Sequence, residues 1–281
     1  MISRSQSFKS AKLQKRRRTV VIGHIVFYAL LLAGLWGFAF ESLALPPINI
    51  TEITVSGSLS LSPSEIVSVS EKLLSGRYFF TIPRTNIFFY PKARIQSTLL
   101  NLFPRLDTVS IHFKNFHAIH IFVTERFPEA LWCHSGLTTL SGSMDGPCFF
   151  LDGTGFVFAP APETSTTSSA FVKLYGILSE ENPIGQTYGS AGELAKLLDF
   201  SKNLVSLDLR VSAFRVQSDN SIEALLNNGA RLIFDRDDNL AVARINLESV
   251  ISDPSFRAAT RHARIDYIDL RFGNKVFYRL K

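Results

Sequence analysis

Three histidines are the first residues of this chain that could support metal chemistry. His112, His117 and His120 flank one expected hairpin, so His112 and His120 could lie opposite each other on paired strands. A zinc site needs three or four ligands, with sulfur or carboxylate support close by, and none stands near these histidines in the sequence. We therefore expect no zinc site here.

A second pattern is similar to the start of a calcium-binding loop. Asp235-x-Asp237-x-Asn239 has the early acidic spacing, but Leu240 stands in place of the required Gly and Asn246 in place of the final Glu. A polar turn before a helix explains the pattern better. The sequence also contains no phosphate loop, G-x-G-x-x-G, H-E-x-x-H or G-x-S-x-G motif. It predicts no cofactor, no metal and no enzymatic activity.

The chain has two cysteines, Cys133 and Cys148. Turn residues between them, Ser141-Gly142-Ser143 and Asp145-Gly146-Pro147, would let the chain bring the two thiols together. A disulfide would close a loop of about 15 residues and contribute about 3 kcal/mol. Two buried free thiols are the alternative.

The N-terminal residues predict a membrane anchor. An uncharged apolar run, residues 19–40, would span about 33 Å as a helix, enough to cross a bilayer once. Because basic flanks stay cytoplasmic, residues 1–18 form the cytoplasmic tail and the chain after the spacer 41–47 lies outside. A cleavable signal peptide is the alternative, with Ser42-Leu43-Ala44 as its cleavage site, but the run and its lead are long for one. Seven cations precede the run: Arg4, Lys9, Lys12, Lys15, Arg16, Arg17 and Arg18.

The charge distribution argues against a nucleic-acid partner. The chain holds 30 Lys and Arg against 24 Asp and Glu, and without the seven tail cations the balance is 23 against 24. A nucleic-acid-binding domain would carry a basic face. The tail cations instead suit anionic lipid head groups beside the anchor.

Residues 48–124 read as one compact unit with the order β-α-(β)-α-β-β. A strand over 48–55 precedes Ser62-Pro63-Ser64-Glu65, a capping box in which Ser62 and Glu65 satisfy each other's amides. Pro91 opens a second helix that ends before Pro104. Alternating apolar residues predict two strands. The inward residues are expected to be Ile95, Leu99 and Leu102 in the second helix, Val109, Ile111 and Phe113 in one strand, and Ile119, Ile121 and Val123 in the next.

Residues 125–281 predict a second unit of short strands and helices. Turn residues mark a hairpin within 149–158 and another at Asn228-Gly229, and 159–169 reads as a solvated loop. The other expected elements are a helix around Leu194 to Leu198, a strand 207–216, a helix 240–251, and two terminal strands 265–272 and 275–280 joined at Gly273-Asn274.

Several short motifs, in order along nearly the whole chain, resemble the FtsQ/DivIB family of bacterial cell-division proteins. They follow a basic tail and a single span, as in that family. The motifs are Ile53-Thr54-Val55-Ser56-Gly57, similar to the opening strand of a POTRA domain; Pro104 before strand 109–113; Glu125-Arg126-Phe127-Pro128-Glu129-Ala130; Asp152-Gly153-Thr154-Gly155; and Tyr267-Ile268-Asp269-Leu270-Arg271-Phe272.

The chain departs from the family pattern at two loops. Asn115-Phe116-His117 stands where the family often has Pro, and Asp235-Arg236 where it often has Gly. The resemblance implies an α+β chain: one transmembrane helix, a POTRA domain at 48–124, and an antiparallel β domain with flanking helices at 125–281.

The resemblance also implies a function. It indicates a non-enzymatic, single-pass scaffold of the inner membrane at the division septum, whose extracytoplasmic domains recruit other membrane division proteins similar to FtsB and FtsL. Two alternatives belong to other classes: a membrane-anchored cell-wall enzyme, which would need a polar cleft of convergent titratable groups, and a POTRA-containing transport or assembly factor, which would carry barrel strands.

The expected binding surface is the last strand, which could accept an added strand at its open edge. In the family an FtsB-like segment is thought to add there, with a Tyr at the position of Phe272. A solvent-exposed edge blunted by Lys275, Arg279 and Lys281 is the alternative. The residues expected to bind are Phe272, Gly273, Asn274, Val276 and Tyr278.

Two charge pairs are expected to be structural. Glu125 and Arg126 point to opposite faces of a strand and should each help to fix the two domains rather than pair with each other. Asp269 and Arg271 share a face and should find cross-strand partners.

Overall fold

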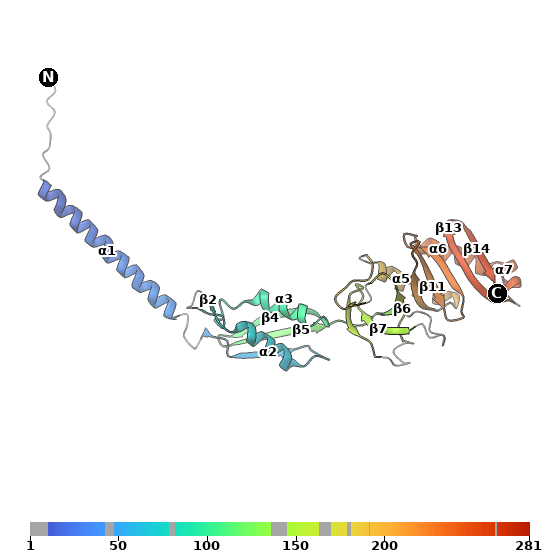
Figure 1. Cartoon of the computed structure of the whole chain (residues 1–281), viewed down its shortest axis with the longest axis horizontal. Helices are drawn as coiled ribbons and strands as arrows, with labels where there is room; N and C mark the ends of the chain where they lie inside the picture. Colours follow the sequence, from blue (N-terminus) through green and yellow to red (C-terminus); the bar gives the residue numbers. More distant parts are fainter. Residues whose placement is uncertain are drawn as a thin grey trace, which may run out of the picture. The chain divides into compact units, whose positions relative to one another are not determined.

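A computed structural model of the chain has the α+β architecture that the sequence predicts (Figure 1). Predictions for Arg4, Lys9, residues 43–47 of the spacer, Ser141-Gly142-Ser143 and much of the loop 159–169 lie outside the described residues. The first two residues of the predicted spacer, 41 and 42, belong instead to the long helix Ala11–Ser42. The chain divides into two compact units, residues 1–99 with 108–124, and residues 100–107 with 125–281. The structure describes residues 11–42, 48–78, 82–135, 145–162, 170–178, 181–190, 192–261 and 263–281.

The first unit begins with a single long helix, α1 (Ala11–Ser42). Its segment Arg16–Phe38, 23 residues, is long and apolar enough to cross a membrane. The described side chains of this helix are exposed within the chain, as expected where lipid would surround them.

Two helices and three strands follow in the first unit. Strand β1 (Glu52–Ser56) pairs in parallel with β5 (Ala118–Glu125), which lies between β1 and β4 (Leu106–Asn115) in the sheet order. Helices α2 (Pro63–Leu74) and α3 (Lys92–Leu102) supply Ile66, Leu74, Ile95 and Leu99 to the core. A two-residue pair, β2 (Arg77–Tyr78) and β3 (Ile82–Pro83), lies between the helices in sequence.

Three predictions for this unit are wrong in detail. Ser62 is the N-cap of α2 but makes no side-chain cap bond; its hydroxyl instead lies 2.7 Å from that of Ser64. Leu102 is exposed because it is the last residue of α3. Phe113 is also exposed, although it alternates with buried Val109 and Ile111, because the buried face of β4 ends at Ile111.

The second unit is built on one mixed sheet (Figure 1). Most neighbouring strands are antiparallel, but β6 with β9, β9 with β10, and β12 with β13 are parallel. Its order is β14-β13-β12-β11-β10-β9-β6-β7-β8. The strands are β6 (Ala130–Ser135), β7 (Asp145–Leu151), β8 (Val157–Pro160), β9 (Lys173–Tyr175), β10 (Val211–Val216), β11 (Ser221–Leu226), β12 (Arg231–Asp235), β13 (Ile265–Phe272) and β14 (Lys275–Leu280).

Three helices cover one face of this sheet: α5 (Glu193–Leu204), α6 (Leu240–Ser252) and α7 (Pro254–Thr260). Their apolar side chains and alternate residues of the strands form one continuous core. Among the strand residues in this core are Phe214, Ile222, Ala224, Leu232, Phe234, Ile268 and Leu270. Since side chains alternate along a strand, the residues between these lie on the opposite face of the sheet.

Two segments of the second unit differ from the sequence prediction. Residues 207–210 are not part of β10, because a short 3-10 turn, η2 (Val205–Leu207), extends α5 and is followed by Asp208 in the left-handed region at φ +57°. Asp145-Gly146-Pro147 lies within strand β7 rather than in a turn. The hairpins at Asn228-Gly229 and Gly273-Asn274 and the helix of residues 240–252 are as predicted.

Cys133 and Cys148 form a disulfide between β6 and β7. The two residues are direct cross-strand partners, with a Cα–Cα distance of 4.1 Å. Cys133 is fully buried in a small cluster with Leu131, Tyr175 and Ala213, on the strands near the middle of the sheet. The bridge thus links β6 to β7, the first two strands of the second unit, at this small buried cluster.

Replacing both cysteines by Ala should lower the free energy of unfolding by about 3 kcal/mol, because the unfolded chain loses a closed loop. Urea unfolding of the purified chain, compared with wild type with and without reductant, measures this. Denatured wild-type protein should take up a thiol-specific label only after reduction. Full labelling without reductant would contradict the disulfide.

Candidate functional site

The terminal hairpin of β13 and β14 forms one end of the large sheet. Among the described strands, β14 pairs with β13 alone, so its other edge carries backbone groups with no strand beside them. Gly273 makes the turn at φ +64°, in the left-handed region that favours glycine. The Asn246 side chain of α6 donates to the Gly273 carbonyl at 2.6 Å and holds the turn against the helix.

The hydrogen bonds of the hairpin show which residues of β14 face the open edge. The Lys281 amide donates to the Arg264 carbonyl, toward β13. Both register shifts fall where β13 has the extra residue, so β14 itself alternates regularly. Phe277 and Arg279 therefore point their amides toward β13, whereas Val276, Tyr278 and Leu280 point theirs outward. This edge can accept an added strand.

Aromatic side chains flank this edge on both faces. Phe272 and Phe277 are 53% and 52% exposed and meet edge to face, with ring centroids 5.0 Å apart. On the helix side, Tyr278 packs edge to face on Phe256 of α7 at 4.9 Å. Such rings offer large apolar area to a partner at low entropic cost.

The predicted binding residues thus differ in accessibility. Phe272, Gly273, Asn274 and Tyr278 are exposed, whereas Val276 is partly buried and packs against the main core. The side chain of Val276 therefore packs in the core, and it is the outward backbone groups of this residue that are available to a partner strand. Sequence reasoning missed Phe277, although the alternation of Lys275 to Leu280 places it beside Phe272.

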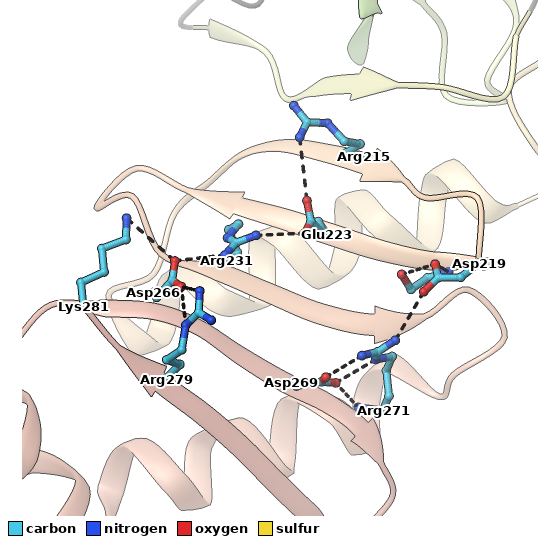
Figure 2. Close-up of polar contacts among 10 residues, drawn as sticks. Arg215, Asp219, Glu223, Arg231, Asp266, Asp269, Arg271, Arg279 and Lys281 are labelled. Carbon is cyan, nitrogen blue, oxygen red and sulfur yellow. Dashed lines mark hydrogen bonds and ion pairs between the residues drawn. The ribbon is translucent and has the colours of Figure 1, made fainter. Parts of the chain in front are cut away.

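A ladder of alternating charges runs across the face of the sheet opposite the helices (Figure 2). Arg215 of β10 lies 3.8 Å from Glu223 of β11, and Glu223 lies 3.3 Å from Arg231 of β12. Arg231 reaches Asp266 of β13 at 3.0 Å. Asp266 also accepts from Arg279 of β14 at 2.8 Å. Each strand from β10 to β14 is thereby linked to the next through side chains.

Asp266 joins the ladder because of a β-bulge. The pairing shifts between Ile265 and Tyr267, leaving Asp266 as the extra residue on β13. Tyr267 pairs with both Arg231 and Arg279, whose guanidinium groups lie 5.9 and 5.1 Å from its ring. The bulge thus places the Asp266 carboxylate where both guanidinium groups reach it.

The cations change the ionisation of Asp266. Hydrogen bonds from Arg279 and then Arg231 hold its pKa below the ordinary value, against a smaller opposing effect of burial. Lys281 adds a longer contact at 3.9 Å. Of the three cations in the alternative of a blunted edge, Arg279 and Lys281 therefore contact Asp266.

Asp269 and Arg271 pair with each other, contrary to our expectation of cross-strand partners alone. Arg271 donates to both carboxylate oxygens of Asp269, at 2.9 and 2.7 Å. It also lies 3.6 Å from Asp219 in the turn before β11 (Figure 2). Because residues two apart on a strand share a face, the long Arg271 side chain can fold back onto Asp269.

Comparison with known proteins identifies the unit that carries this edge. Residues 144–271 match the family model described as cell division protein FtsQ/DivIB, C-terminal. The matched residues make up a little under half of the chain, and the match supports the FtsQ/DivIB family. That family implies a role in cell division. No curated protein matches the chain.

The family match ends one residue before Phe272, so it covers most of β13 and none of β14. The FtsQ/DivIB assignment accordingly rests on the body of the sheet. Strand β14, with its open edge, lies outside the matched residues.

The FtsQ/DivIB-like motif at residues 152–155 has a clear structural role. Asp152 accepts from the Thr154 amide and hydroxyl and from the Phe156 amide, at 2.8, 2.6 and 3.0 Å. It also forms an ion pair with Arg126, whose guanidinium lies 4.4 Å from the Phe156 ring. Burial would raise the pKa of Asp152, but the hydrogen bonds from Thr154 and Arg126 lower it overall.

The other candidate residues have local partners. His120 lies between Thr54 and Ser56, at 2.9 and 2.8 Å from their hydroxyls. His112 contacts Ser110 at 3.1 Å. Asn239 caps α6 by accepting from the Ala241 amide. Within the part of the chain that the structure describes, no group of three or more potential metal ligands is present.

The Asp266 bulge predicts a pH-dependent attachment of β14. Because the folded pKa is lowered, the contribution of Asp266 is present above its ordinary pKa of about 3.9 and is lost as the pH falls through the folded value. Asp266→Asn should therefore speed hydrogen exchange of residues 275–281 at neutral pH. The ratio of mutant to wild-type rates should approach one in acid.

Hydrogen exchange followed by mass spectrometry of the peptide 275–281 measures this ratio. Asp219→Asn is the matched control, since Asp219 is an exposed carboxylate that contacts Arg271 and not β14. Equal exchange of wild type and Asp266→Asn at neutral pH would show that the ladder does not hold the strand.

Proposed function

We propose that the chain is a non-enzymatic scaffold of the division septum that captures another membrane division protein at the open edge of β14. The observation that carries the proposal is the row of outward backbone groups at Val276, Tyr278 and Leu280, flanked by exposed Phe272 and Phe277. An extended segment of a partner, similar to FtsB or FtsL, would continue the sheet there. Main-chain hydrogen bonds would supply affinity and the rings specificity.

The proposed topology has the chain cross the inner membrane once. Residues 1–18 are a cytoplasmic tail, residues 19–40 are a retained anchor in the inner membrane, and residues 41–47 are a spacer. A POTRA domain over 48–124 and a β domain over 125–281 lie outside. The length of the apolar segment in α1 and the basic residues before it support this orientation. The anchor would confine the edge to the plane in which membrane partners diffuse.

Val276→Pro should abolish partner capture with limited effect on the fold. Proline removes the outward amide of Val276, which the sheet itself does not use, and edge positions tolerate proline. Val276→Ala is the matched control, because it loses the same core packing but keeps the amide. Partner pull-down from cross-linked membranes should fall at least about tenfold for Val276→Pro relative to Val276→Ala, if one hydrogen bond and its strand geometry are lost.

The same pair of variants tests the cellular role. Cells depleted of the native chain should form filaments, and expression of Val276→Ala should restore division whereas Val276→Pro should not. Thermal unfolding of both purified variants checks that they fold. Full restoration of division by a folded Val276→Pro chain would reject strand addition at β14, and normal division after depletion would reject the scaffold role.

A further inference from the structure

An exposed aromatic cluster lies at one end of the first unit's sheet. Phe88, Phe113 and Phe116, here called the aromatic tip, are 64%, 57% and 53% exposed. Phe116 contacts the other two rings, with centroids 6.4 and 5.7 Å away. Three large rings grouped in water are unusual for a surface without a partner. None of them belongs to the edge proposed to bind division proteins.

The aromatic tip lies at the end of the sheet where the chain arrives from α1. The Ile87 amide, next to Phe88, donates to the Ile48 carbonyl at 2.9 Å. The Thr51 amide donates to the His117 carbonyl, next to Phe116, at 2.8 Å. The first residues after the anchor's spacer therefore run beside the tip.

Chain length sets how far the aromatic tip can move from the membrane. The apolar segment Arg16–Phe38 would span about 35 Å, slightly more than a hydrocarbon core of about 30 Å. The end of α1 at Ser42 would then lie at the level of the head groups. From Ser42 to Ile48 the chain can extend by at most about 20 Å. The tip is therefore held close to the bilayer surface.

The charge around the aromatic tip suits an anionic lipid surface. Residues 82–94 and 108–124 contain Arg84, Lys92, Arg94 and Lys114 and no Asp or Glu. Lys92 and Arg94 are exposed at the start of α3, just after Phe88. Glu52 is the acidic neighbour, paired with Lys114 at 3.0 Å. Among the described residues, Lys92 and Arg94 form no salt bridge. Apolar rings beside such cations are the combination that binds anionic membrane interfaces.

We propose that the aromatic tip inserts into the outer head-group layer of the membrane that α1 crosses, with Lys92 and Arg94 on anionic lipid phosphates. This contact would fix the first unit against the bilayer. It rests on the membrane anchoring proposed above and is separate from partner capture at β14.

Depth-dependent quenching on the full chain in vesicles tests the proposal. Single cysteines are introduced by His117→Cys at the tip, Leu59→Cys beyond the other end of β1, and Ala33→Cys within the apolar segment. They are labelled with a nitrobenzoxadiazole dye without reductant, so the disulfide-bonded native cysteines do not react. The vesicles contain phosphatidylcholine with nitroxide-labelled lipid, with or without phosphatidylglycerol.

The label at position 117 should be quenched roughly threefold or more above that at position 59, and more strongly with phosphatidylglycerol. Phe113→Ser with Phe116→Ser, in the chain labelled at 117, should remove the excess. Phe122→Ser is the matched control, since Phe122 is an exposed ring toward the other end of β5. It should leave the quenching unchanged.

The possible failures are distinguishable. Quenching at 33 with equal quenching at 117 and 59 would overturn insertion of the tip while leaving the anchor in place. No quenching at 33 would overturn both the anchor and the tip. A label at 117 that is shielded from aqueous iodide but not quenched by lipid would show a protein on the tip and overturn the lipid assignment. Quenching at 117 that the Phe113→Ser and Phe116→Ser changes leave unaltered would overturn the role of the rings. Quenching at 117 that does not depend on phosphatidylglycerol would overturn the role of the cations.

Discussion

The last strand of the large sheet is hydrogen-bonded on one side only among the described strands, and the surrounding structure compensates for this. A terminal strand with one neighbour tends to fray, yet strand addition needs it straight and in register. Side chains supply the missing constraint on both faces. Val276 and Tyr278 pack toward the core and Phe256, while Arg279 is tied to Asp266 on the other face. Because these side-chain contacts fix the strand, its outward backbone groups stay available for hydrogen bonds.

The charge ladder extends that constraint into the body of the sheet. Exposed ion pairs contribute little singly, but these carboxylates are largely buried, and each is shared between two or more cations. Glu223 and Asp266 are the shared acids, so shifting one strand would disturb contacts on both of its sides. Register across β10 to β14 is therefore specified twice, by the apolar residues on the helix face and by charge on the other.

The sequence predicts the parts of this arrangement that depend on local rules. Asn228-Gly229 and Gly273-Asn274 mark their hairpins because each turn has a left-handed position that its glycine fills, at φ +82° for Gly229 and +64° for Gly273. Helix α6 follows from the spacing of Leu240, Ala243 and Leu247. The three-residue strand β9 was not predicted, since it is too short to show alternation and is defined by its parallel neighbours. The bulge at Asp266 was missed as well, because only the pairing with β14 reveals the extra residue on β13.

An exposed edge of this kind also has to avoid pairing with its own copy. Lys275, Arg279 and Lys281 stand on one face of β14, and the basic residues of two antiparallel copies would approach one another across the new pair. Asp266 neutralises part of this charge within the chain but leaves Lys275 without an ion pair among the salt bridges of the described residues. Self-pairing is therefore disfavoured by like charge. In the proposed strand addition, a segment carrying acidic side chains opposite these positions would meet no such penalty, so the same cations would favour an acidic partner segment.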